Sequence, residues 1–237
     1  MNGSALVRGL TTGEAARQLG VDQSRVRQLL LDGDLHGERL SSGQWIVSGA
    51  SVAERETTRP SPCRKWNSDT AWLVLEQLEY VDWSCGTKST HATASSRHRV
   101  RNYLVHWDVE QLAAKLIGAI PFKRFDAQNP EKVARELLLS GRSRASQIGG
   151  GLRDRSDVAD GYVTSEQLSR LERTYGLIQS DEGNVSIGIV PDEVDNAQGV
   201  WRALIALDLA RSTSTRERSA GLSALEKCRS RWLAGSN

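Results

Sequence analysis

The alternation of apolar and polar positions in residues 11–56 predicts two short helices, a tight turn, a two-stranded wing and a third helix. In the second helix, Val26, Leu29 and Leu30 recur at spacings of i, i+3 and i+4. This spacing is typical of a helix that buries one face. The sequence therefore predicts that the first two helices pack on each other along a narrow apolar seam.

Local residues mark where these helices begin and end. Thr11 and Glu14 have the S/T-x-x-E spacing of a capping box, which indicates a helix start. Gly20 tolerates the left-handed conformation in which helices often end, and Asp22 is a good cap for the next helix. Gly33 is expected to close that second helix.

The wing is predicted from a change of period after the second helix. Residues 35–39 and 44–47 are short strand-like runs, and residues 41–43 (Ser-Ser-Gly) between them indicate a turn. Within the second run, Trp45 and Val47 are expected to face the core. The segment as a whole thus has the order helix, turn, helix, wing, helix.

The pattern leaves a set of polar residues on the outside of the second helix and the wing. These candidate DNA-binding residues are Gln23, Ser24, Arg25, Arg27, Gln28, Arg39, Ser42 and Gln44. The segment from TTGEAARQLGVDQSRVRQLLLDGDL to GQWIV, about a fifth of the chain, resembles the winged helix-turn-helix of the MerR, excisionase and AlpA superfamily. The resemblance implies a second helix that enters the major groove and a wing that contacts the neighbouring backbone.

On this resemblance, Arg25 would bind guanine edges and Gln28 adenine, while Arg27 or Arg39 would bind phosphate. The charge of the segment departs from a strongly basic domain. Residues 1–59 hold seven Lys or Arg and seven Asp or Glu, Glu38 of the wing among them, and the whole chain has a net charge of only +2. We therefore expect modest non-specific affinity for double-stranded DNA and a homodimer that supplies a second reading copy.

The fold class predicted for the chain is α+β, mainly α. Residues 1–56 form the winged helix-turn-helix, and residues 57–67, with Pro60 and Pro62, form a linker. Residues 68–118 form a helical segment with three helices, and residues 119–237 form a mixed α+β domain for partner binding or dimerisation.

Within the helical segment, residues 68–83 predict an amphipathic helix capped by Ser68, and residues 84–95 predict a polar loop. Ser95 or Ser96 is expected to cap the next helix, and Asp108 the third. Two groups of basic residues lie beyond the winged segment: Arg97, His98, Arg99 and Arg101, and, on the last helix, Arg216, Arg218, Lys227, Arg229 and Arg231. The first group could contact DNA backbone, but we favour a solvated helix face.

The final domain has a less regular pattern. It predicts strands at 122–125 and 161–163, helices at 130–140, 165–175 and 214–233, a loop at 141–157 and a hairpin at 177–191. Residues 200–210 are apolar enough to be buried as helix or strand, and Asp208 among them is expected at a helix surface or cap. The glycines of residues 149–151 lack the spacing of a phosphate loop.

The order GYV, YGL, EGNVSIGIVPD, ALIALDLA and ERSAGLSAL, over residues 161–225, weakly resembles the C-terminal half of AbiEi-type antitoxins. That resemblance implies a transcriptional regulator that autoregulates its operon and binds a nucleotidyltransferase-type toxin.

Motifs for chemistry are missing from the sequence. Cys63, Cys85 and Cys228 form no C-x-x-C pair, so we expect no metal site, and no cofactor or catalytic residue is predicted. No apolar run is long enough to span a membrane, and the start MNGSALVRGL lacks the apolar region of a signal peptide. We expect a non-enzymatic protein in the cytoplasm, at the nucleoid.

Three functions compete. The first is a sequence-specific DNA-binding regulator, in its narrower form an antitoxin. The second is an excisionase-like architectural factor, and its usual small size argues against it here. The third is a non-catalytic protein-interaction scaffold, against which the outward Arg25, Arg27 and Gln28 argue.

Overall fold

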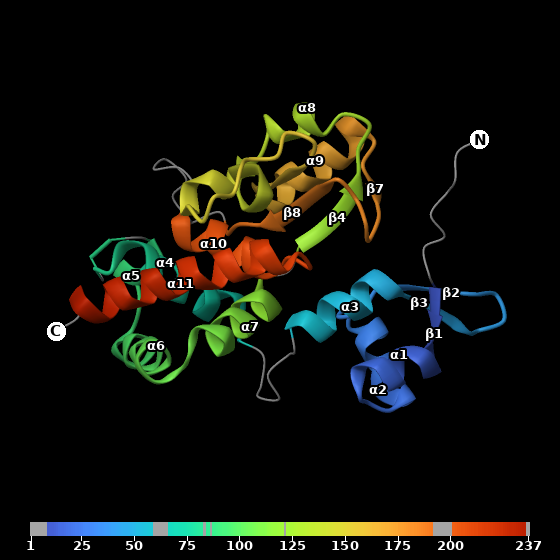
Figure 1. Cartoon of the computed structure of the whole chain (residues 1–237), viewed down its shortest axis with the longest axis horizontal. Coiled ribbons are helices and arrows are strands. Elements are labelled where there is room, and N and C mark those ends of the chain that lie inside the picture. Colours follow the sequence, from blue (N-terminus) through green and yellow to red (C-terminus); the bar gives the residue numbers. More distant parts are fainter. Residues whose placement is uncertain are drawn as a thin grey trace. The chain divides into compact units, whose positions relative to one another are not determined.

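The computed structural model describes residues 9–58, 66–82, 84–85, 87–120, 122–191 and 201–235. The protein is mixed α+β and mainly α, with 58% helix and 14% strand, which confirms the predicted fold class. The chain divides into two compact units, residues 1–59 and residues 60–237 (Figure 1). Residues 59–65 of the predicted linker lie outside the described residues.

The first unit is a small three-helix domain with a three-stranded antiparallel sheet. Its elements are β1 (Gly9–Thr11), α1 (Thr12–Leu19), α2 (Gln23–Leu31), β2 (Gly37–Arg39), β3 (Trp45–Ser48) and α3 (Gly49–Thr58). The sheet has the order β1-β3-β2, so the two predicted wing strands pair with each other. The sequence did not predict β1, whose Leu10 lies opposite Val47 and packs against the same core.

The predicted helix ends of this unit are confirmed. The Thr11 hydroxyl accepts from the Glu14 amide, and the Glu14 carboxylate accepts from the Thr11 amide at 2.8 Å. Gly20 ends α1 in the left-handed region, at φ 67°. The Asp22 carboxylate caps α2 by accepting from the Arg25 amide at 2.8 Å. These contacts satisfy the backbone amides that a helix start otherwise leaves without partners.

The second unit combines helices with one five-stranded sheet. Its helices are α4 (Ser68–Tyr80), α5 (Thr87–Thr90), α6 (Ala94–His106), α7 (Val109–Ala119), α8 (Pro130–Ala134), the 3-10 helix η1 (Gly141–Ile148), α9 (Ser165–Tyr175), α10 (Arg202–Ala210) and α11 (Thr215–Gly235). Its strands are β4 (Phe122–Asp126), β5 (Leu138–Leu139), β6 (Ala159–Val163), β7 (Ile178–Gln179) and β8 (Val185–Ile189). The sheet order is β5-β6-β8-β4-β7, and β6 and β8 are its one parallel pair.

The two faces of this sheet pack into different cores, as alternate strand residues must. Val163 and Ile187 join Leu168 and Leu171 of α9 in the smaller core. Tyr162 joins the larger core, which contains residues of α4, α6, α7, α10 and α11. In Figure 1, α8 and α9 accordingly lie on one side of the sheet, and α10 and α11 lie on the other. The larger core therefore joins the segment 68–118 with the segment 119–237.

Helix α4 is buried all round, and the prediction of an amphipathic helix capped by Ser68 is wrong. All eight residues from Ala71 to Leu78 are buried, and Asn67 is the capping residue. The buried polar side chains of α4, Glu76 and Gln77, have hydrogen-bond partners. The Glu76 carboxylate accepts from the Lys88 and Ser89 amides, and the Gln77 amide donates to the Ser89 hydroxyl.

The hairpin predicted at residues 177–191 is also wrong. Strands β7 and β8 each pair with β4 instead of with each other. The turn between them wraps around the end of β4. The Asn184 side chain accepts from the Ala127 amide and donates to the Ala127 carbonyl, both at 2.9 Å. The Ser180 amide donates to the Arg124 carbonyl.

Several boundaries differ from the predictions for similar reasons of pairing and capping. The helix predicted at 130–140 ends at Ala134, because Leu138 and Leu139 pair with β6. Thr93, rather than Ser95 or Ser96, caps α6. The loop predicted at 84–95 contains α5, the loop at 141–157 contains η1, and residues 202–210 are helix.

Candidate nucleic-acid interface

The outward face of α2 carries the predicted DNA-binding residues of the first unit. Val26, Leu29 and Leu30 are buried in the core of this unit. Gln23, Ser24, Arg25, Arg27 and Gln28 are all exposed, as are Arg39, Ser42 and Gln44 of the wing. The eight residues thus lie on solvent-facing parts of α2 and the wing, where a ligand can reach them.

The helical period divides this face into a centre and two flanks. Ser24, Gln28 and Leu31 follow one another at i, i+4 and i+7, so they lie along one line at the centre of the outward face. Arg25 and Arg27 are about 200° apart around the helix axis, so they lie on opposite flanks. A groove-binding helix would place the central line at the bases and the flanks near the two backbones.

Leu31 is a residue that the sequence analysis missed. It is 70% exposed, unlike the neighbouring Leu29 and Leu30. Its position off the apolar stripe of α2 is the feature of the sequence that could have predicted its exposure. An exposed apolar side chain on this line could contact the methyl group of thymine.

Two of the polar side chains on α2 are held by neighbours within the unit. The Ser24 hydroxyl donates to the Asp22 carboxylate at 2.5 Å, and the Gln28 amide donates to Asp32 at 2.8 Å. The hydrogen bond from Ser24, followed by that from the Arg25 amide, lowers the pKa of Asp22. The ionised Asp22 occupies the positive end of the α2 dipole, so phosphate contacts must come from side chains instead.

The arginines are available for such contacts. Among the described residues, no hydrogen bond or ion pair engages the guanidinium groups of Arg25, Arg27 and Arg39. In contrast, at least five of the seven acidic residues of the unit have partners within it. These are Glu14 with Thr11, Asp22 with Ser24, Asp32 with Gln28, Asp34 with Arg55, and Glu56 with Gln18. Of these five, Asp34 is paired with a cation, and the other four bond neutral groups and keep their charge. The unit is therefore balanced in charge, but within its described part these acidic side chains are engaged while the arginines on the flanks of α2 are not.

The wing separates its charges between two faces. Cross-strand partners share a face of the ribbon. Arg39 lies opposite Trp45, which packs against the core, whereas Glu38 lies opposite the exposed Ile46. Glu38 therefore lies on the other face from Arg39, and its charge opposes Arg39 less than the sequence alone suggests.

The base of the wing approaches α2 closely because residue 37 is glycine. A Cβ atom there would lie 2.6 Å from the Ile46 carbonyl oxygen and 2.9 Å from Leu30 Cδ2. The wing tip is closed by hydrogen bonds from Leu40 to Gln44 and from Gly43 to Leu40, both 2.8 Å. The wing is thus held against α2 at its base and presents Ser42 at its tip.

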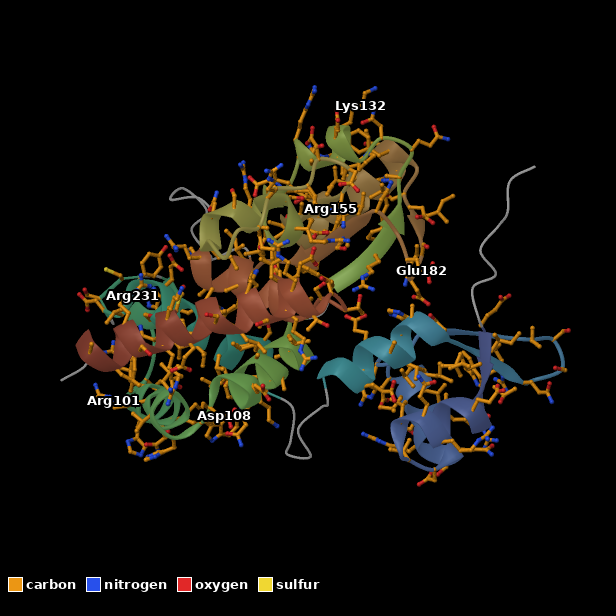
Figure 2. The ribbon with its side chains drawn as sticks, in the orientation of Figure 1. Arg101, Asp108, Lys132, Arg155, Glu182 and Arg231 are labelled. Carbon is orange, nitrogen blue, oxygen red and sulfur yellow. The ribbon has the colours of Figure 1, made fainter. Side chains whose placement is uncertain are left out.

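Several arginines of the two basic groups in the second unit donate hydrogen bonds to backbone carbonyls. Arg97 donates to the Ser89 and Ala92 carbonyls, Arg229 to Leu104 and Val105, and Arg231 to Leu78 and Glu79. Arginines in such positions tie helix ends together. Arg99 and Arg101 of α6 remain exposed, and Figure 2 shows Arg101 on the outside of its helix.

A buried polar cluster lies in the second unit, and the expectation that Asp208 lies at a helix surface or cap is wrong. The Asp208 side chain is 1% exposed. It accepts from the Ser140 hydroxyl at 2.5 Å and from the Tyr162 hydroxyl at 2.8 Å, and Arg211 Nε lies 3.6 Å away. Ser140 is fully buried, so no substrate can reach its hydroxyl in this conformation. We interpret the cluster as a tie between η1, β6 and α10.

Burial raises the pKa of Asp208 to about 7, against the lowering effects of Arg211, Ser140 and Tyr162. Because this value lies above that of the unfolded chain, the folded state binds the proton more tightly. The stabilisation is present below about pH 4 and is lost as the pH rises through about 7.

We expect Asp208→Asn to remove this pH dependence. The free energy of unfolding of the native protein should fall, relative to the variant, by at most about 4 kcal/mol between pH 4 and pH 8. Urea unfolding of both proteins at each pH measures the difference. A difference that stays constant over this range would contradict the raised pKa.

Among the described residues, no three His, Cys, Asp or Glu side chains gather closely enough to hold a metal ion. None of the described helices is both long and apolar enough to cross a membrane. The chain matches no protein-family model, no curated protein and no solved structure. The resemblances to winged excisionase-like domains and to AbiEi-type antitoxins therefore stay predictions from the residues that carry them.

Proposed function

We propose that the protein is a sequence-specific DNA-binding transcriptional regulator that reads double-stranded DNA with α2 and the wing. The observation that carries this proposal is the outward face of α2. Two arginines that have no hydrogen bond or ion pair from their guanidinium groups to the described residues flank a central line of Ser24, Gln28 and Leu31. A helix with a polar, readable centre and basic flanks is suited to the major groove, which it can enter between two phosphate backbones.

The roles of the two arginines follow from their positions on the flanks. Each is close enough to the edge of the helix to reach phosphate, and Arg25 could also turn towards a guanine. A phosphate contact contributes affinity and salt dependence, whereas a base contact contributes sequence preference. The salt dependence of binding can therefore distinguish the two roles.

We expect Arg25→Ala/Arg27→Ala to bind the protein's own promoter DNA at least about 30-fold more weakly than the native protein. Fluorescence anisotropy with a labelled promoter fragment and an unrelated competitor measures the affinity. If both arginines contact phosphate, the slope of log K against log salt should flatten by about two for each bound protomer. If one of them reads a base, the slope should flatten by about one for each bound protomer.

The matched control is Arg170→Ala/Arg173→Ala on α9, which removes the same charge from exposed positions of the second unit. It should bind DNA as the native protein does. Equal binding by the α2 variant and the native protein would contradict the assignment of α2. If the native protein binds no DNA at low salt, the scaffold alternative is favoured.

A single winged unit reads few base pairs, so we propose that the protein acts as a homodimer on a two-fold related site. Sedimentation of the protein with and without DNA tests this. An excisionase-like role would instead predict strong bending of the bound fragment. Binding of a nucleotidyltransferase-type toxin by the second unit stays a prediction from the resemblance. The absence of catalytic activity stays a prediction from the missing motifs.

A further inference from the structure

A small pocket opens between η1, α10 and α11 of the second unit. It has a volume of about 220 Å³ and is lined by Ile148, Arg202, Ala224, Lys227, Cys228 and Arg231. Four of these residues, at positions 224, 227, 228 and 231, follow the i, i+3, i+4, i+7 spacing of one helical face. One face of α11 therefore supplies most of the wall, and Arg202 at the first turn of α10 closes it.

Among the residues that the structure describes, the charged groups lining this pocket are all cationic. Arg231 is fixed in place because its guanidinium donates to the Leu78 and Glu79 carbonyls at 2.9 and 2.8 Å. Arg202 and Lys227 have no hydrogen bond or ion pair with any part of the chain that the structure describes. Arg202 and Lys227 lie in the same pocket as Arg231, so the three positive charges repel one another. An anion bound between Arg202 and Lys227 would relieve that repulsion.

Within the described part of the second unit, the Glu79 carboxylate lies near this group and limits its charge. Glu79 accepts from the Ala203 amide at 3.0 Å, and it is close enough to act on the Cys228 thiol. Among the described residues, three cations and this carboxylate leave a formal charge of about +2, which matches a phosphate monoester dianion at neutral pH. Arginine also presents paired donors that fit phosphate oxygens.

The rest of the wall is apolar. Ile148 and Ala224 offer methyl and methylene groups, and the Cys228 side chain is only 7% exposed. The volume is below the 300–1,000 Å³, roughly, of pockets that hold drug-sized ligands. The geometry therefore calls for a small molecule with one strongly anionic group and a compact apolar part.

We propose that the pocket of Arg202, Lys227 and Arg231 binds a small organic phosphate monoester, with the phosphate between Arg202 and Lys227 and the apolar part against Ile148 and Ala224. The site does not depend on DNA binding by the first unit. It can therefore be tested on the full chain without DNA.

Calorimetric titration with phenyl phosphate at low salt measures the binding directly. We expect Arg202→Gln/Lys227→Gln to weaken it by about tenfold or more. The matched control, Arg99→Gln/Arg101→Gln on the exposed face of α6, removes the same charge elsewhere and should bind as the native protein does. Inorganic phosphate lacks the apolar part and benzoate lacks the second charge, so both should bind more weakly than phenyl phosphate.

Cys228 provides an independent reporter inside the pocket. In a Cys63→Ser/Cys85→Ser background it is the remaining cysteine of the chain. Phenyl phosphate should slow its alkylation by iodoacetamide in this background, and the protection should disappear when Arg202→Gln/Lys227→Gln is added. Circular dichroism verifies that each variant is folded. Absence of phenyl phosphate binding to the native protein at millimolar concentration, or equal binding by the native protein and the pocket variant, would overturn the proposal.

Discussion

Gly221→Ala is expected to lower the free energy of unfolding by about 3 kcal/mol, although alanine is the better helix former. A Cβ atom at position 221 would lie 2.4 Å from the Ala210 amide nitrogen and 2.6 Å from the Ala206 carbonyl oxygen. Both are backbone atoms of α10, so they can move away only if α10 and α11 separate. The cost of this overpacking exceeds the gain of about 1 kcal/mol in helix propensity.

Gly118→Ala in α7 is the matched control, because no described atom beyond its own helical turn lies within 4 Å of the added atom. This variant should be stabilised by up to about 1 kcal/mol. Urea unfolding followed by tryptophan fluorescence suits the comparison, since six of the seven tryptophans lie in residues 60–237. Similar stability of the two variants would mean that α10 and α11 do not pack as closely as described.

Arg142→Met should cost about 3–5 kcal/mol, because the buried Asp160 carboxylate loses its cation and keeps the backbone amide of residue 142 as a donor. Arg142 Nε and Nη2 donate to the two Asp160 carboxylate oxygens, each at 2.7 Å, and the Asp160 side chain is 6% exposed. Adding Asp160→Leu to this variant should restore part of the loss, because no buried charge then remains.

The neighbouring pair of Arg155 and Asp157 supplies the control for this prediction. Its side chains are 45% and 64% exposed, and Figure 2 shows Arg155 among the side chains of the second unit. Water screens such a pair, so Arg155→Met should cost less than about 1 kcal/mol. Thermal unfolding of the three variants and the native protein gives the comparison. Equal losses for Arg142→Met and Arg155→Met would show that burial does not decide the strength of the Arg142 pair.

The first unit was predictable because its signals are local. Thr11 and Glu14 cap within three residues of each other, and Asp22 caps the Arg25 amide at the same spacing. The exposed residues of α2 could be predicted because Val26, Leu29 and Leu30 define its buried face. Leu31 was not predicted at the interface because an apolar residue is usually assigned to the core. Its position off the buried stripe of α2 nevertheless indicates an exposed side chain.

The second unit was less predictable because its errors involve partners far away in the chain. Residues 180–184 have the composition of a hairpin turn, but Ser180 and Asn184 at its two ends bond to Arg124 and Ala127, about 57 residues earlier. Asp208 can be buried because the hydroxyl groups of Ser140 and Tyr162, 68 and 46 residues away in the chain, donate hydrogen bonds to its carboxylate. No local sequence pattern predicts a hydrogen-bond partner so far away in the chain. For the same reason, the sequence did not predict that Arg202 lies beside the face of α11 that lines the pocket.

The burial of α4 on every side has a consequence for how the chain folds during synthesis. The partners of Leu78 and Gln77 include Arg231 and Trp232, which follow 153 and 155 residues later. At roughly 5–20 residues per second, the ribosome needs roughly 8–30 seconds to supply them. The first unit, whose core lies within residues 10–52, can fold before that interval begins. Until α11 emerges, the apolar surface of α4 lacks part of its cover and is the natural binding site for a chaperone.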